Sequence, residues 1–497
     1  MHVKSLLARP FAGFIYNKVK KEMASAVQDQ NSIRQYLIKS AQHTLFGKDH
    51  GFDKIKTYED FKKQIPVRDY EALRPYVEKV KEGRQNILWK GKPLYFAKTS
   101  GTTSGAKYIP ISKESISNHI NTARNALLCY IAQTGKADFT GGKMIFLSGS
   151  PELDRIGGVP SGRLSGIVNH HVPPYLRTHQ LPKYETNCIE DWETKLDKIV
   201  AETSSKDMTL ISGIPPWVQM YFDRLVEKHG KKVGEIFPNF SLLVYGGVNF
   251  EPYRQKLFES IGKEIDSIEL FPASEGFFAF QDSQTEKGML LNTNSGIFFE
   301  FIPADQYGKP DARRLSLEEV EVGQNYALII SNNAGLWAYD IGDMVRFVST
   351  SPYRIVVTGR TKHFISAFGE HVIGEEVDYA MQTAAKACGA KITEFTVAPM
   401  VVQGEGKSYH EWFVEFEKMP ENMDKLALAI DHHLRRKNTY YDDLIAGGIL
   451  STLKITPVKK DGFIQYMRSI GKLGGQNKLP RLSNDRKIAD ALKEFLI

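Results

Sequence analysis

The sequence is short of cysteine, and this shortage narrows the class of protein. Its three cysteines, Cys129, Cys188 and Cys388, are odd in number and widely spaced. They suit neither a disulfide framework nor a metal site of the CxxC type, so we expect buried thiols that act as small apolar side chains. With 497 residues, 42% of them hydrophobic, the chain is long enough for a substantial core and for more than one domain.

Long apolar runs are also missing. No stretch approaches the roughly 18 apolar residues that a membrane span requires. The opening segment MHVKSLLARPFAGFIYNKVKKE lacks the uninterrupted apolar centre of a secretion signal. We therefore expect a globular cytoplasmic protein with no membrane span.

Charge of one sign is scarce as well. The net charge of +7 arises from 65 basic against 58 acidic residues, an excess that could suit an anionic ligand. Nucleic-acid-binding domains concentrate Lys and Arg on one face. Here the short clusters KVKKE and HHLRRK lie far apart between acidic segments, so a solvated surface is favoured and no nucleic-acid partner is expected.

What the sequence does contain is an ordered series of periodic segments. Residues 1–90 show helical spacing, as at Ile33, Leu37 and Ala41, and predict a helical entry segment. Short apolar runs then alternate with amphipathic ones as far as SIELFPASEG, which predicts β-α-β units and a largely parallel sheet. From Met289 to Val357 several apolar runs follow without a helix between them, and an antiparallel or barrel-like region is expected. After TGRTK the pattern changes to that of a small α+β domain, so we place a boundary near Arg360.

The stretch AKTSGTTSGAKYIPIS, from Ala97 to Ser112, concentrates hydroxyl side chains, glycines and lysines. Hydroxyls and the backbone N–H groups of Gly101 and Gly105 are donors, and glycine lets a main chain approach a ligand closely, so the loop suits phosphate. It is not a Walker A loop, because GxxxxGK[ST] would need Gly at Ala106 and Ser or Thr at Tyr108. In isolation, a polar turn between strands is the simpler interpretation.

A second motif, ELFPASEG, puts Phe271 at the end of a predicted strand and Glu275 four residues later. Ligands bind at strand ends in open α/β sheets. There an aromatic ring can stack on a base, and a carboxylate can hold Mg²⁺ beside phosphates. A nucleophile elbow with Ser274 at its tip is the rival interpretation, but that motif begins with Gly and turns directly into a helix, whereas FFAFQ after Gly276 predicts a strand.

A third motif, WAYDIGDMVRF, places Gly342 and Asp343 before a predicted strand. An acidic residue in such a position can bind both hydroxyls of a ribose. Alone, the Gly-Asp pair is only a turn.

In this order, the three motifs resemble the adenylate-forming superfamily of acyl-CoA synthetases, adenylation domains and luciferase. The closer resemblance is to its Gretchen Hagen (auxin-responsive) acyl-acid amido synthetases, of which the chain looks like a prokaryote-like member. This branch is indicated by SGTTSGAKYIP, YGGVNFEPYRQKL, FPASEG and NNAGLWAYDIGDMVRF. The resemblance implies an α/β fold with a large domain over 1–360, which binds ATP and the acyl acid, and a small mobile α+β domain over 361–497.

The resemblance also implies roles for individual residues in an ATP site. The phosphates would be wrapped by Ser100, Gly101, Thr102, Thr103 and Gly105, with Lys107 at the mobile end of the loop. Adenine would be bordered by Gly246, Gly247 and Phe271, and the ribose held by Asp343. Ser274 and Glu275 match the end of the family's aromatic-x-x-Ser-Glu motif, and Glu275 would bind Mg²⁺.

Two more matches concern the second domain. Arg360 corresponds to the arginine that ends the large domain, and the hinge would follow at Thr361 and Lys362, although the superfamily pattern has Asp where Lys362 stands. The late segment GGQNKLPRLSNDR makes Lys478 the candidate catalytic cation, with Arg481 beside it. A lysine is a mobile point charge suited to transient phosphate contacts. Without the resemblance, a solvated lysine would be the simpler interpretation.

The function implied is that of a ligase using ATP and Mg²⁺. A carboxylic acid would be adenylated with release of pyrophosphate, and the acyl group then transferred to an amine, expected to be an amino acid. An acyl-CoA ligase on the same scaffold and a nucleotide-binding regulator without turnover remain alternatives. The acyl substrate is left open, as are the oligomeric state, with a monomer favoured, and the role of His170 and His171.

Overall fold

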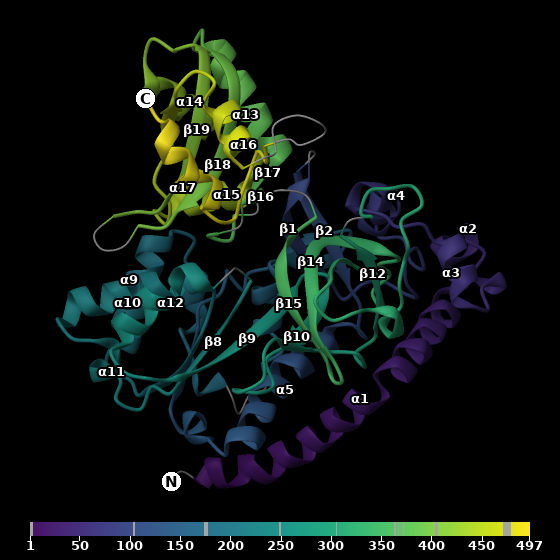
Figure 1. Cartoon of the computed structure of the whole chain (residues 1–497). Helices are drawn as coiled ribbons and strands as arrows, with labels where there is room; N and C mark the ends of the chain where they lie inside the picture. The colour runs from purple at the N-terminus through teal and green to yellow at the C-terminus, as the bar shows by residue number, and fades with distance from the viewer. Residues whose placement is uncertain are drawn as a thin grey trace. The chain divides into compact units, whose positions relative to one another are not determined.

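The computed structural model divides into two compact units. Unit 1 comprises residues 1–99, 107–190 and 194–361, and unit 2 comprises 100–106, 191–193 and 362–497. The structure describes residues 3–102, 105–172, 177–247, 250–304, 306–361, 364–365, 367–370, 372–402, 406–470 and 479–497. Figure 1 shows the helices and strands of both units.

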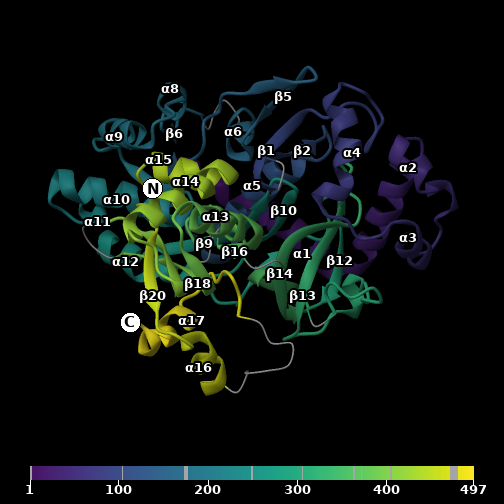
Figure 2. The same cartoon turned by 90° about the horizontal axis from the view of Figure 1, so that it is seen from above.

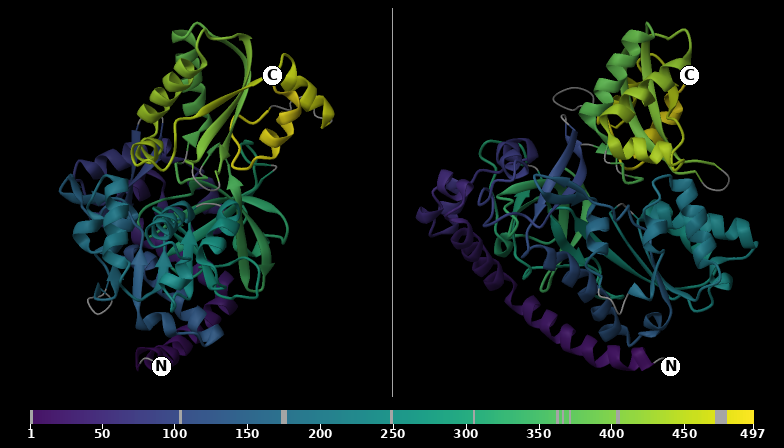
Figure 3. Two further views of the ribbon diagram at one scale, coloured as in Figure 1. Left: turned by 90° about the vertical axis from the view of Figure 1, so that its left-hand side faces the viewer. Right: turned by 180° about the vertical axis from the view of Figure 1, so that it is seen from behind.

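Helices dominate the first 90 residues, as predicted. The first is α1 (Val3–Ala41), a single long helix that runs along the outside of unit 1 (Figure 3). The helices that follow are α2 (Leu45–Asp49), η1 (Phe52–Lys54), α3 (Tyr58–Gln64) and α4 (Tyr70–Lys81). Thr57 and Asp60 form a reciprocal cap at the start of α3, and Asp69 accepts from Ala72 N at 3.1 Å at the start of α4. Such caps stabilise a helix by about 1 kcal/mol.

An eleven-stranded mixed sheet forms the body of unit 1, in the order β12-β13-β14-β15-β11-β10-β9-β8-β7-β3-β6. Its parallel part confirms the predicted β-α-β alternation, because β3, β7, β8 and β9 pair in parallel. The elements here are β3 (Lys143–Phe146), α6 (Leu164–Asn169), β6 (Gln180–Leu181), α8 (Tyr184–Asn187), α9 (Trp192–Thr203), β7 (Met208–Ser212), α10 (Pro215–His229), α11 (Val233–Ile236), β8 (Leu242–Gly246), α12 (Glu251–Ile261) and β9 (Asp266–Ala273). A proline in the first turn of α10 lacks only an N–H that would have no partner there.

The rest of the sheet is antiparallel, as expected for Met289 to Val357, and it is continuous with the parallel part. The strands are β10 (Gly276–Phe280), β11 (Met289–Leu291), β12 (Ile297–Pro303), β13 (Asn325–Asn332), β14 (Tyr339–Thr350) and β15 (Tyr353–Arg360), with η3 (Leu317–Glu319) before β13. A smaller sheet has the order β2-β1-β5-β4. Its strands β1, β2 and β5 are labelled in Figure 2. Its strands are β1 (Tyr95–Thr102), β2 (Gly105–Ile111), β4 (Asp154–Ile156) and β5 (Val159–Gly162), and α5 (Ile116–Thr134) and η2 (Asp138–Gly141) lie between β2 and β3 in the chain.

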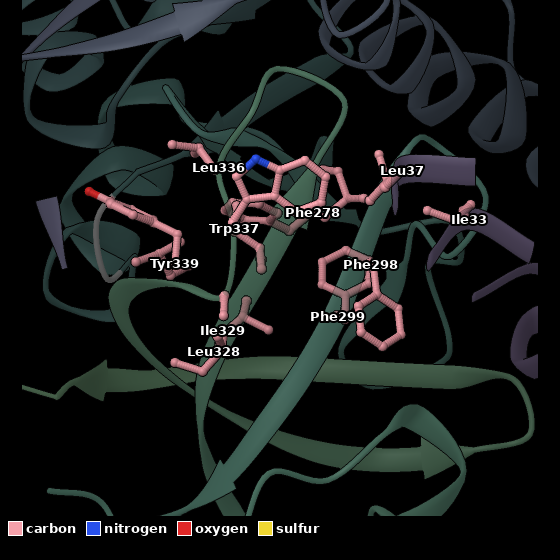
Figure 4. Close-up of a cluster of buried hydrophobic side chains, with 14 of the residues drawn as sticks. Ile33, Leu37, Phe278, Phe298, Phe299, Leu328, Ile329, Leu336, Trp337 and Tyr339 are labelled. Atoms are coloured by element: carbon pink, nitrogen blue, oxygen red, sulfur yellow. The ribbon is translucent and has the colours of Figure 1, made fainter. Parts of the chain in front are cut away.

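A cluster of apolar and aromatic side chains holds α1 and the antiparallel strands together (Figure 4). Ile33 and Leu37 of α1 meet Phe298 and Phe299 of β12, and Trp337 is fully buried. Burying one such side chain contributes about 1.5–3 kcal/mol. Burial of Trp337 in this core therefore fixes the segment that leads into β14. Strand β14 itself carries part of the candidate site.

Unit 2 is built on a three-stranded sheet with the order β18-β19-β20. Helices α13 and α14 cover one face, and α16 and α17 lie on the other (Figure 3). The elements are β16 (Phe364–Ile365), β17 (Val372–Ile373), α13 (Gly374–Ala387), β18 (Lys391–Met400), β19 (Tyr409–Lys418), α14 (Met423–Lys437), α15 (Thr439–Ala446), β20 (Lys454–Val458), α16 (Gly462–Ser469), α17 (Lys487–Ala491) and η4 (Leu492–Phe495).

The expectation of buried thiols is confirmed for only one of the three cysteines. All three cysteines are free thiols, but only Cys129 is fully buried, while Cys188 and Cys388 are half-buried. Among the described residues, no helix has both the length and the apolar character needed to cross a bilayer.

Candidate nucleotide-binding site

Glu275 lies in a two-residue turn between two neighbouring strands. β9 extends to Ala273, two residues further than the sequence indicated, and Ala273 pairs with Gly276 at the start of β10. Ser274 and Glu275 form the connection, and both are half-buried. The strand that follows Gly276 confirms that this motif is a hairpin and not a nucleophile elbow.

Asn332, at the end of β13, anchors this turn. Its Nδ2 donates to the carbonyl oxygen of Glu275 at 2.8 Å, and its Oδ1 accepts from Ala334 N and Leu336 N at 3.0 Å each. The Asn332 side chain is buried, and the two bonds to its Oδ1 are shielded from water, while the bond to Glu275 O is half-buried. Asn332 was not among the predicted site residues. Its place as a polar residue at the end of an apolar run, at the start of NNAGLWAYDIGDMVRF, is the feature of the sequence that could have indicated it.

Tyr339, the first residue of β14, interacts electrostatically with the carboxylates of both Glu275 and Asp340. Burial raises the pKa of the Tyr339 phenol well above its usual value, and the carboxylates of Glu275 and Asp340 raise it further. Its hydroxyl is buried without a hydrogen-bond partner among the described residues, and Figure 4 shows the hydroxyl pointing away from the apolar cluster. A neutral Tyr339 thus lies beside two carboxylates.

Asp343 and Gly342 lie inside β14, so the prediction that they precede a strand is wrong. The strand begins at Tyr339, because that segment is already held by the core and by the ladder with β13. Gly342 has a positive φ of 82°, which glycine adopts without strain, and its N–H donates to Asp340 Oδ1 at 2.8 Å. Asp343 is buried and lies directly opposite Arg360 of β15.

Of the two aspartates in YDIGD, Asp340 forms several hydrogen bonds with neighbouring parts of unit 1. Besides the bond from Gly342 N, it accepts a hydrogen bond from the Tyr307 hydroxyl. Its backbone N–H donates to Arg68 O at 2.8 Å. These bonds give Asp340 a structural explanation that does not require a ligand.

Gly246, the last residue of β8, and Gly247, which follows it, are each explained by the local backbone. A Cβ on Gly246 would lie 2.3 Å from the carbonyl oxygen of Leu270 on β9, so only glycine allows this close pairing. Gly247 has a φ of +83°. Together they bring the end of β8 beside Phe271, as the expected adenine site would require.

Phe271 is a core residue near the carboxyl end of β9. It is buried and meets the ring of Phe278 edge to face, with 5.1 Å between centroids. Such packing fixes the ring. Any base bordered by Phe271 would therefore meet a rigid surface.

The predicted phosphate loop connects β1 and β2. Ser100, Gly101 and Thr102 belong to β1 and Gly105 to β2, and the segment 100–106 falls in unit 2. Thr103 lies outside the described residues. Lys107, in unit 1, places Nζ over the ring of Tyr70 at 5.8 Å, and Tyr108 N donates to the Tyr70 hydroxyl at 2.9 Å.

The expected second-domain residues are only partly described. Lys362 and Lys478 lie outside the described residues. Arg481 is described and is already engaged: it pairs with Glu394, with Asp378 at 3.0 Å, and lies over the ring of Phe395 at 4.4 Å. Its guanidinium is therefore already engaged by two carboxylates of this chain.

The paired histidines make local contacts. His170 Nε2 is 2.7 Å from Pro151 O, and His171 Nε2 is 3.1 Å from the Tyr95 hydroxyl. Burial lowers the pKa of His171, as does the neighbouring His170. Both contacts join the loop after α6 to other parts of unit 1.

A magnesium site would have to include oxygen atoms from a ligand. In the part of the chain that the structure describes, no three His, Cys, Asp or Glu side chains are grouped so that they could hold a metal ion. Mg²⁺ is commonly bound by one or two carboxylates together with substrate phosphates. The single half-buried carboxylate of Glu275, on a turn fixed by Asn332, fits that donor set.

Two solved structures share the fold of this chain. The acyl acid amido synthetase AtGH3.15, in complex with 2,4-DB, matches with a TM-score of 0.61 at 15% identity, over 97% of this chain and 95% of that chain. A 2-hydroxyisobutyryl-CoA ligase, in complex with 2-HIB-AMP and CoA, gives 0.57 at 14% identity, over 96% and 92%. The chain has the fold of the adenylate-forming enzymes.

Models of one family match along most of the chain. They are the GH3 family N-terminal domain at residues 15–186, the central domain at 290–360 and the C-terminal domain at 375–487. The chain belongs to the GH3 family, which confirms the resemblance inferred from the motifs. A relative, the jasmonoyl–L-amino acid synthetase JAR4 of Nicotiana attenuata, is 21% identical over 93% of this chain and 90% of its own length.

Proposed function

We propose that this protein is an ATP-dependent acyl-acid amido synthetase. The observation that carries the proposal is the match of three successive GH3 family domains to a chain that also aligns with nearly the full length of an acid–amino acid synthetase. The turn at Glu275, which Asn332 holds, and the position of Asp343 opposite Arg360 support the proposal that ATP binds at these strand ends.

In the first half-reaction, a carboxylate oxygen attacks the α-phosphorus of ATP, and the bond to pyrophosphate breaks to leave an acyl-adenylate. Ser100, Gly101, Thr102, Thr103 and Gly105 bind the phosphates, and Lys107 lies at the end of that loop. Gly246, Gly247 and Phe271 border adenine, Ser274 adjoins the metal ligand, and Asp343 with Arg360 binds the ribose side. Glu275 would hold Mg²⁺, which would supply charge neutralisation at the phosphates. Catalysis rests on positioning and charge stabilisation.

In the second half-reaction, an amine attacks the adenylate carbonyl, and AMP leaves as the amide forms. We assign Lys478 to stabilise the adenylate phosphate, since a lysine on a mobile segment can make such a contact transiently. We assign residues 1–360 to nucleotide and acid binding and 361–497 to a domain that turns between the two half-reactions. The acceptor is an amino acid, and the protein acts as a cytoplasmic monomer.

An acyl-CoA ligase is the second candidate, because the 2-hydroxyisobutyryl-CoA ligase shares the fold. A panel of carboxylic acids, tested for ATP-dependent pyrophosphate release with amino acids or with coenzyme A, separates the candidates. We expect an acyl-amino acid amide in the product mass spectrum. Acyl-CoA formed in preference to any amide would replace the amido synthetase assignment, and a lack of pyrophosphate release with every acid would favour a nucleotide-binding regulator.

A further inference from the structure

Two phenylalanine side chains on the outward face of α1 remain exposed to solvent. Phe11 is 47% exposed and Phe14 is 68% exposed. Their spacing to Lys18 and Lys21 is three, four and three residues, which places all four on one side of the helix. The side chains of Lys18 and Lys21 are also exposed.

The opposite face of the same helix already anchors it. Ala12, Ile15 and Val19 are buried in a cluster with Cys129 and Tyr130 of α5. Because the inner face supplies the packing, the outer phenylalanines contribute little to folding. Large aromatic side chains left exposed beside one another mark an interaction surface.

The charge of this segment indicates what would bind there. Residues 8–21 contain Arg9, Lys18, Lys20 and Lys21 and no acidic residue. The next acid, Glu22, is 3.7 Å from Lys18 at the edge of the face, with its side chain only 20% exposed. The face is therefore apolar at its N-terminal end, at Phe11 and Phe14, and positively charged toward its C-terminal end, at Lys18 and Lys21.

We propose that this face of α1 binds the surface of an anionic phospholipid membrane. A helix that lies in the headgroup region buries aromatic side chains among acyl chains and directs lysines toward lipid phosphates. A second copy of the chain is a poor occupant, because a two-fold contact would bury Lys18 and Lys21 with no acidic residue among 8–21 to pair with them. The helix would lie along the membrane surface, with its inner face still packed on α5.

Vesicle flotation with the full-length protein tests the proposal. We expect binding to phosphatidylcholine vesicles that contain phosphatidylglycerol, little binding to phosphatidylcholine alone, and weaker binding at high salt. The variant Phe11→Ser/Phe14→Ser should lower the partition coefficient by about tenfold or more. The variant Lys18→Gln/Lys21→Gln should remove much of the preference for anionic vesicles while keeping the helix.

The matched control is Val322→Ser/Leu428→Ser, which removes two side chains that are 57% and 60% exposed on other elements. It should bind vesicles like the parent protein. Circular dichroism and thermal unfolding report whether each variant is folded. No binding to anionic vesicles by the folded parent would overturn the proposal, as would equal loss in the control, or self-association in sedimentation velocity that depends on Phe11 and Phe14 and needs no lipid.

Discussion

Asp343 on β14 and Arg360 on β15 occupy directly opposite positions of an antiparallel ladder. The next residue, Thr361, donates its N–H to Gly342 O at 2.9 Å, so the ladder is held at this point from both sides of Asp343. Arg360 and Thr361 are also the last residues of unit 1. The proposed ribose site and the end of the large unit are therefore one structural feature.

Replacing Asp343 tests the ribose assignment. In Asp343→Ala we expect ATP to bind more weakly, by a few kcal/mol at most, because hydrogen bonds to a charged acceptor are lost away from the reacting atoms. Isothermal titration calorimetry with ATP measures the change, and Asp311→Ala, at an exposed loop position, is the control. Unchanged affinity in a folded Asp343→Ala protein would place the ribose elsewhere.

Glu275 is the residue whose charge matters most to the proposal. We expect Glu275→Gln to fold normally and to lose adenylation, since an amide cannot neutralise a metal ion that bridges phosphates. Pyrophosphate release at ordinary Mg²⁺ concentrations is the measurement, with Glu286→Gln, an exposed carboxylate, as the control. Near-parental release would remove Glu275 from the metal site.

The variant Asn332→Asp tests whether the position of the Glu275 turn matters, without changing the charge of Glu275 itself. Asn332→Asp keeps an acceptor for Ala334 N and Leu336 N but loses the donor to Glu275 O. We expect a stability loss of about 1–3 kcal/mol and slower pyrophosphate release. Urea unfolding and initial rates measure the two effects. A stable variant with parental rates would show that the turn keeps its position without this bond.

Lys478 is expected to act on the reaction and not on the fold. Lys478→Ala should retain the parental unfolding transition and show reduced turnover with an accepted acid. Lys487→Ala, in which a lysine side chain that is 89% exposed is removed, should keep full activity. If both variants turn over at the parental rate, the catalytic cation is another residue.

His119 should make the fold sensitive to mild acid. Burial lowers its pKa from 6.5 to about 4, and its Nδ1 has no hydrogen-bond partner among the described residues. Between these values the unfolded chain binds a proton that the folded chain does not, so stability falls as the pH falls through that window. From pH 7 to pH 5 the loss is at most about 2 kcal/mol.

Urea midpoints at several pH values test this dependence. The variant His119→Leu should show a flatter profile than the parent, whatever its absolute stability. His43→Gln, which changes an exposed histidine, should keep the parental slope. An identical slope in His119→Leu would mean that other groups cause the acid sensitivity.

Much of the fold could be predicted because local patterns encode it. Alternating apolar and amphipathic runs predicted the parallel strands and the helices between them, and FFAFQ predicted the strand after Gly276. The boundary of β14 was missed because Gly342 and Asp343 resemble a turn locally. In the structure, pairing with β13 and β15 keeps them in a strand.

The sequence by itself determined the family and the candidate residues, because the motifs and their order can be read without knowing any contact. Only the tertiary structure decided which of these residues are fixed by the fold: Asn332 holds the Glu275 turn from 57 residues away, and Asp340, not Asp343, accepts from Gly342 and Tyr307. Such bonds depend on which strands become neighbours. Strand order follows from the packing of the whole core, so no local pattern contains it.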